Sequence, residues 1–137
     1  MILVDSSVWI DQLADRETLQ TMLLKQLLQD GQDIGIGDLV MAEVLQGTGR
    51  GRTFAVVKAY LGEFTPVQVS DHAIAETAAR YYRALRERGI TIRKTIDTLI
   101  ATRCIVDRIP LLYSDRDFDP FVQHLGLRSA TGVSGIN

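Results

Sequence analysis

Short apolar runs alternate with helical patterns along this chain, and that alternation limits the possible folds more than any other feature. Residues 2–4 and 111–113 are apolar or aromatic throughout, which is typical of strands buried on both faces of a parallel sheet. The spacing of apolar residues predicts helices between such runs. Because strands alternate with helices, we expect an α/β fold, with a mainly parallel central sheet of about five strands flanked by helices.

The expected elements follow one another without a linker, an internal repeat or a low-complexity tract. Strands are expected at residues 2–4, 33–37, 65–70 and 110–114, with a last edge strand at 126–130. Helices are expected at residues 5–13, 17–29, 38–46, 53–63, 71–88 and 94–106, followed by a short one within 115–126. Asp38 is expected to cap the helix that it begins, and Gly89 to end the helix of residues 71–88.

The size and composition of the chain fit one globular domain over residues 1–137. The chain has 137 residues, of which 46% are hydrophobic and 23% charged, enough to bury a sizeable core. No apolar run reaches the ~18–20 residues of a membrane span, and the first residues lack the basic segment of a signal peptide. The single cysteine, Cys104, lies on an apolar helical stripe and is expected to be a buried free thiol. We therefore expect a cytoplasmic protein that makes no use of a membrane.

The charge balance excludes a protein that binds nucleic acid through a dominating basic surface. The formal net charge is −2 and the pI is about 5.6, although local contacts to nucleic acid remain compatible with an acidic pocket. Two basic clusters stand out, one with Arg50 and Arg52 and one from Arg80 to Lys94. By default, such clusters are solvated faces of helices and loops.

Acidic residues recur where strands end, and this is the main sign of a functional site. Asp5 follows the first strand, Asp115 and Asp117 follow the strand at 110–114, and Glu43 lies early in the helix after residues 33–37. Asp97 lies in the first turn of the helix that leads, by a short connection, into the strand at 110–114. In a parallel sheet that helix must begin at the carboxyl edge of the strands, so all these acids are expected at one rim.

Each acid also has an ordinary structural explanation. An aspartate is a good N-cap or turn residue, and an acid in the first turn of a helix is favoured by the helix dipole. These explanations do not account for several carboxylates meeting at one place, where they repel and raise one another's pKa. A cation would remove that penalty, and oxygen ligands without histidine or thiolate suit Mg²⁺ or Mn²⁺. Such an ion is suited to the hydrolysis of phosphodiesters.

Other α/β folds with an acid after the first strand fit the sequence less well. Phosphatases of the haloacid dehalogenase type need a second aspartate two residues after the first, where this chain has Ser7. Receiver domains need paired acids there, and no phosphate-binding P-loop is present in the sequence. His72 and His124 have no partner at the spacing of metal ligands, so surface or capping roles are expected for both.

Four segments together resemble the motifs of PIN-domain ribonucleases. They are "MILVDSSVWID" at the start, "AEVLQG" at 42–47, "TIDTLIA" at 95–101 and "LLYSDRDF" at 111–118. Their order and even spread resemble the VapC toxins of bacterial type II toxin–antitoxin pairs. The resemblance implies that the acids Asp5, Glu43, Asp97 and Asp115 bind metal, with Asp117 as a second acid at the fourth position.

The resemblance also implies a biological setting. It implies a Mg²⁺- or Mn²⁺-dependent endoribonuclease that inhibits translation by cutting RNA, often a structured RNA such as tRNA. It further implies a VapB-like antitoxin that blocks the site, a homodimer, and larger toxin–antitoxin assemblies. The hydroxyl of Ser6 or Ser7 would support the site, and Ser114 stands where the family more often has threonine or asparagine.

Two hypotheses remain open beside the site. Arg93 and Lys94, one turn before Asp97, and Arg50 and Arg52 further out, are candidates for contacts to RNA phosphates. The alternative to an enzyme is a non-catalytic PIN-like protein that acts only through its partner. The complete set of acids argues against that alternative, because a protein without activity would tolerate the loss of an acid.

Overall fold

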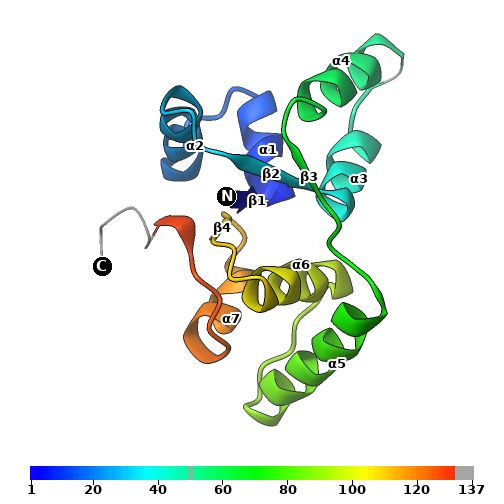
Figure 1. Ribbon diagram of the computed structural model, residues 1–137, viewed down its shortest axis with the longest axis vertical. Coiled ribbons are helices and arrows are strands. Elements are labelled where there is room, and N and C mark those ends of the chain that lie inside the picture. The colour runs from blue at the N-terminus through cyan, green and yellow to red at the C-terminus, as the bar shows by residue number, and fades with distance from the viewer. Residues whose placement is uncertain (50, 132–137) are drawn as a thin grey trace.

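A parallel sheet of four strands organises the computed structural model, which describes residues 1–49 and 51–131 apart from the side chain of Arg52. The strands stand in the order β3-β2-β1-β4 and comprise β1 (Ile2–Val4), β2 (Ile34–Gly37), β3 (Thr65–Val67) and β4 (Leu111–Leu112). The helices are α1 (Ser6–Leu13), α2 (Leu19–Gln29), α3 (Asp38–Gln46), α4 (Arg52–Leu61), α5 (His72–Glu87), α6 (Thr95–Val106) and α7 (Asp119–His124), with the 3₁₀ turn η1 (Arg116–Phe118) before α7. In Figure 1, α2, α3 and α4 lie in the upper half of the view and α5, α6 and α7 in the lower half.

The expected α/β class with a parallel sheet is confirmed. Strand β1 lies inside the sheet, where Leu3 is in register with Gly35 of β2 on one side and with Leu111 of β4 on the other. The chain adds β2 and β3 on one side of β1 and then crosses to place β4 on the other side. This reversal of direction beside β1 is the position where open α/β sheets form ligand sites, beyond the carboxyl ends of the strands.

Two local expectations were wrong. The segment 126–130 forms no fifth strand, because its only ladder contact among the described residues is a single parallel bridge between Leu111 and Ser129. Asp38 is the first residue of α3 rather than its cap, which is Gly37. The Asp38 carboxylate instead accepts hydrogen bonds from the backbone N–H groups of Leu39 and Val69, and so joins α3 to the segment after β3.

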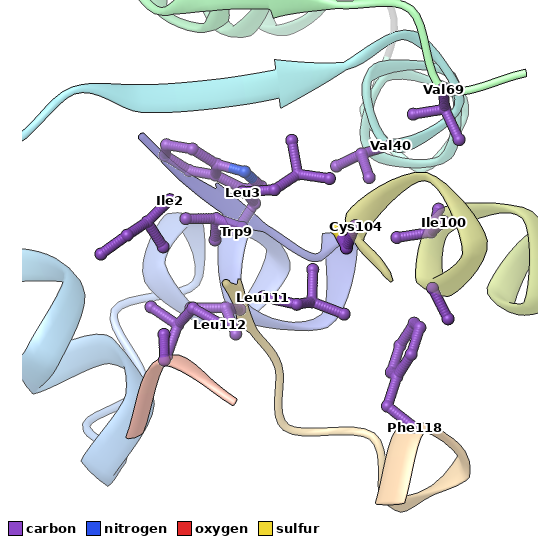
Figure 2. Close-up of a cluster of buried hydrophobic side chains, with 14 of the residues drawn as sticks. Ile2, Leu3, Trp9, Val40, Val69, Ile100, Cys104, Leu111, Leu112 and Phe118 are labelled. Carbon is purple, nitrogen blue, oxygen red and sulfur yellow. The ribbon is translucent and has the colours of Figure 1, made fainter. Parts of the chain in front are cut away.

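The core explains why the sheet can be so short. Side chains from β1, β4, α1, α3 and α6 meet around the sheet, and Figure 2 shows Leu3, Trp9, Val40, Ile100 and Leu111 among them. Trp9 is fully buried and its ring contacts those of Tyr60 and Phe64, with centroids 5.9 Å and 5.0 Å away. Burial of this apolar surface, rather than strand length, holds β1 and β4 in place.

The helix pair α5 and α6 is fixed at one end by a charged junction. Asp71 caps α5, since its carboxylate accepts from the backbone N–H of Ile74 at 2.8 Å, and it also forms a 2.8 Å ion pair with Arg103 of α6. Arg103 donates in addition to the backbone oxygen of Val69 and pairs with Asp107. The last turn of α6 is thereby joined to the start of α5 and to the segment after β3. No helix within the described residues is both long and apolar enough to cross a membrane.

Candidate metal centre

Asp5 follows β1 directly and is the most deeply placed acid. It caps α1, and its Oδ2 accepts hydrogen bonds from the backbone N–H of Ser7 at 3.1 Å and from the Ser7 hydroxyl at 2.6 Å. The residue is 2% exposed, and its other oxygen, Oδ1, is buried without a hydrogen-bond partner among the described residues. Burial raises the pKa of Asp5, while the bonds from Ser7 act against that rise. One oxygen is therefore fixed by the helix cap, and the second is unpaired.

Glu43 comes to the site from α3, beyond the end of β2. The hydroxyl of Ser6 donates to Glu43 Oε1 at 3.0 Å, so neighbouring serines orient two different acids. The negative charge of Glu43 contributes to the raised pKa of Asp5, so the two carboxylates repel each other. The first turn of α1 thus holds the carboxylates of β1 and α3 in one arrangement.

Asp97 lies in the first turn of α6, as the sequence predicts, and it is 4% exposed. Its Oδ2 is buried without a hydrogen-bond partner among the described residues. The pKa of Asp97 is raised to about 7, first by burial and then by the charges of Asp5, Asp115 and Glu43, against a lowering effect of Lys94. A cation that bound beside an acid with this pKa would displace its proton at neutral pH.

Asp115 and Asp117 follow β4 and flank the start of η1. The backbone N–H of Asp117 donates to Asp115 Oδ1 at 2.9 Å, so the turn fixes one acid against the other. Carboxylate oxygens of Asp97, Asp115 and Asp117 lie within 4.8 Å of one another. The end of β4 and the start of α6 therefore contribute to one acidic group, and the charges of Asp5 and Glu43 act on Asp97 within it.

Ser114 connects the segments that follow β1 and β4 at this edge. Its backbone N–H donates to the Ser7 hydroxyl at 3.3 Å, and Ser7 in turn donates to Asp5. The Ser114 hydroxyl itself is buried without a partner among the described residues. The sequence offered no signal for this chain of contacts, because it joins residues more than a hundred positions apart.

The basic residues have different positions. Arg93 forms an ion pair with Asp117 in which Nε and Nη2 both lie 3.1 Å from Oδ2, a contact that the sequence analysis missed. Lys94 is exposed, precedes α6 as its cap residue, and acts electrostatically on Asp97. Arg50 and the side chain of Arg52 lie outside the described residues. His72 and His124 are exposed at other elements, the start of α5 and the end of α7.

The chemistry of the donors fits a hard divalent cation. The site offers carboxylate oxygens and serine hydroxyls, the ligand types that Mg²⁺ and Mn²⁺ prefer. Within the part of the chain that the structure describes, buried oxygens of Asp5 and Asp97 have no partner, and in a folded protein a buried acceptor without a partner costs free energy. A cation between these acids would satisfy both oxygens and remove the repulsion that raises their pKa.

Comparison with known proteins gives the same picture of the fold. The chain is 26% identical to ribonuclease VapC11 of Mycobacterium tuberculosis and to VapC ribonuclease Mb1587 of Mycobacterium bovis, each over 96% of this chain and 98% of the relative. A toxin–antitoxin complex from Klebsiella pneumoniae contains a chain with a TM-score of 0.68 and 19% identity, covering 94% of this chain and 97% of that one. VapBC2 from Rickettsia felis, bound to a promoter DNA fragment, gives a TM-score of 0.69 and 18% identity over 94% and 97% of the two chains.

Sequence similarity identifies the family of this chain. The sequence profile of the PIN domain matches residues 2–121, a range that includes every acid of the site and all four strands. The alternating α/β order, the acids at the carboxyl edge of the sheet and the match over most of the chain agree with one another. This chain belongs to the PIN domain family.

Proposed function

We propose that the protein is an endoribonuclease that depends on Mg²⁺ or Mn²⁺ and hydrolyses phosphodiester bonds of RNA at the acidic site. The observation that carries the proposal is the pair of buried, unpartnered oxygens, Asp5 Oδ1 and Asp97 Oδ2, within one group of mutually repelling acids. Relatives along nearly the whole chain are named as ribonucleases, which supports RNA as the substrate.

The proposed roles follow from the contacts. Asp5, Asp97, Asp115 and Glu43 would hold the cation, which supplies an activated water and neutralises charge on the phosphate. Ser7 orients Asp5 through two hydrogen bonds, and Ser6 orients Glu43 through one. The burial of Asp5 and Asp97 keeps bulk water away from the carboxylates, and this strengthens their electrostatic interactions.

Asp5→Asn tests the proposal while keeping the helix cap, because asparagine caps about as well as aspartate. The variant removes one ligand charge, so we expect RNA cleavage with Mg²⁺ or Mn²⁺ to fall by at least about a hundredfold. The matched control is Asp71→Asn, which changes the other aspartate cap, that of α5, and should retain cleavage. Wild-type cleavage that persists unchanged in excess EDTA would refute the metal dependence.

We further propose that the nuclease is the toxin of a toxin–antitoxin pair, inhibits translation by cutting RNA, and forms homodimers and complexes with an antitoxin. One solved structure of similar fold is named as a toxin–antitoxin complex, that from Klebsiella pneumoniae, and the relatives along nearly the whole chain are named as VapC ribonucleases. The surface supports a partner as well, because Ile10, Leu13 and Val57 line an apolar hollow of about 350 Å³ between α1, α3 and α4.

An antitoxin that blocks the acidic site is expected to do so with an arginine, whose guanidinium pairs with carboxylates and competes with the cation. Co-expression with the product of a small neighbouring gene and co-purification should give a complex without RNA cleavage. A stable complex that remains fully active would show that the acids are not the inhibited site. If purified protein bound such a partner but never cut RNA, the non-catalytic alternative would replace the nuclease.

A further inference from the structure

One member of the acidic group, Asp117, contacts a basic side chain in addition to lying beside the other acids. Asp117 accepts two contacts from Arg93, whose Nε and Nη2 both lie 3.1 Å from Oδ2. Exposed ion pairs contribute little to stability, and the Arg93 side chain is 74% exposed. Stability therefore gives little reason for the pair, and its position beside Asp97 and Asp115 suggests a role in the site.

Both members of the pair are held by the fold. The backbone N–H of Asp117 donates to Asp115 Oδ1, and the following residue, Phe118, is fully buried. Arg93 follows Ile92, which is 5% exposed, and precedes α6 by two residues. The guanidinium therefore has a fixed place relative to Asp115 and to the start of α6, even though most of it faces solvent.

We propose that Arg93 is a phosphate-binding residue for the RNA strand next to the cleaved bond, and that Asp117 is the positioning residue that holds it there. A guanidinium carries five N–H donors; Nε of Arg93 donates to Asp117 Oδ2, and Nη2 lies within ion-pair distance of the same oxygen. The remaining donors face solvent and can bind a phosphate oxygen. This inference rests on the proposed function, and it divides the two acids after β4: Asp115 serves the cation and Asp117 serves Arg93.

Electrostatics supports the same surface. Lys94, the next residue, lies near enough to Asp97 to lower its pKa, so two cationic residues border the acids at the start of α6. A polyanion approaching carboxylates needs such a positive border, because phosphate and carboxylate charges repel. An arginine already held by a carboxylate has also lost part of the rotamer freedom that binding of a phosphate would otherwise cost.

The test is a double-mutant cycle on RNA binding without metal. We would measure binding of a labelled single-stranded RNA in EDTA for wild type, Arg93→Ala, Asp117→Asn and the double variant. Arg93→Ala should weaken binding about three- to tenfold at low salt and lower the salt slope by about one. Asp117→Asn also removes a negative charge, which alone would favour RNA. In the Arg93→Ala background only this charge effect remains. The effect of Asp117→Asn on RNA affinity should therefore be less favourable, by about threefold or more, when Arg93 is present than when it is replaced by alanine.

A matched control is available at the far end of α1. Arg16 and Asp11 form an exposed ion pair of 2.9 Å with side-chain exposures of 64% and 21%, close to the 74% and 22% of Arg93 and Asp117. The same cycle on Arg16→Ala and Asp11→Asn should show no coupling in RNA binding. Equal coupling in both pairs would assign the effect to general surface charge and overturn the proposal.

A second measurement separates positioning from metal binding. If Asp117 acts through Arg93, Asp117→Asn keeps most of the gain in melting temperature that Mn²⁺ gives the wild type, whereas a metal ligand would lose it. Additive effects in the binding cycle, or a gain in RNA affinity from Asp117→Asn that is larger with Arg93 present, would overturn the positioning role. If neither wild type nor any variant cuts RNA, the proposed nuclease activity is refuted. The binding cycle would still show whether Asp117 positions Arg93 for RNA binding.

Discussion

At the scale of single residues, the site depends on carboxylates placed where a carboxylate is costly. Asp5 and Asp97 are 2% and 4% exposed, and each has an oxygen without a partner in the described structure. Burial and mutual repulsion raise the pKa of both. Residues with this combination reduce stability in the absence of a ligand, and such residues cluster at functional sites.

Asp97→Asn is expected to stabilise the metal-free protein or leave it unchanged, because it removes a buried charge that Asp5 and Asp115 repel. The same variant should lose RNA cleavage and most of the gain in melting temperature that Mg²⁺ or Mn²⁺ gives wild type. Thermal melts with and without metal, beside a cleavage assay, measure both effects. If Asp97→Asn cuts RNA and responds to metal like wild type, Asp97 has only a structural role.

The raised pKa of Asp97 gives a pH dependence with a defined sign. The folded carboxyl has a pKa of about 7 against an ordinary value of 3.8, so between these values the folded state holds a proton that the unfolded state has released. Stability from this group is therefore lost as pH rises through that interval. In EDTA, the melting temperature of wild type should fall relative to Asp97→Asn between about pH 4 and about pH 8. A constant difference between the two proteins across this range would contradict the shift.

At the scale of elements, the carboxyl edge of the sheet could be predicted from sequence, whereas the neighbours along the sheet could not. Asp5 and Asp115 were placed correctly because residues that follow parallel strands share an edge, whatever the strand order. The direction of α6 followed from its short connection to β4, and this placed Asp97. The order β3-β2-β1-β4 has no local signal, and neither does the contact of Ser114 with Ser7. The expectation of an edge strand at 126–130 was wrong, because the sequence pattern of a five-residue stretch with a glycine is too short to distinguish a strand from a single bridge.

Strand β2 contains a position where the close approach of a neighbour requires glycine. A Cβ added to Gly37 would lie 2.7 Å from Val69 Cγ2, and Val69 is fully buried, so the side chain cannot move aside easily. We expect Gly37→Ala to destabilise the protein by about 1–3 kcal/mol, measured by urea unfolding. Gly49→Ala, where the nearest atom is 4.0 Å away, is the control and should change stability by less than about 0.5 kcal/mol. Equal midpoints for the two variants would show that the segment after β3 shifts without cost.

At the scale of the whole molecule, one group of acids gathers at the carboxyl edge of the sheet, while one group of basic residues runs from α5 to the start of α6. The net charge of −2 hides this arrangement, which explains why composition argues against a dominating basic surface for nucleic acid but not against a local site. The acids come from four distant segments that meet only in the complete sheet. Any change that opens the sheet should therefore remove the site along with the fold.

The buried free thiol of Cys104 makes that opening measurable. It is the chain's single cysteine, is 1% exposed, and lies on α6 among the buried side chains shown in Figure 2. Burial also raises its pKa, which keeps it in the unreactive thiol form. Labelling by a maleimide or iodoacetamide should thus proceed only from molecules that have opened, and its rate at equilibrium reports the opening free energy. Mg²⁺ or Mn²⁺ should slow labelling of wild type and leave the rate for Asp97→Asn almost unchanged. Immediate labelling of the native protein would contradict the packing around Cys104. The labelling rate of this thiol therefore reports how often the assembled acidic site opens.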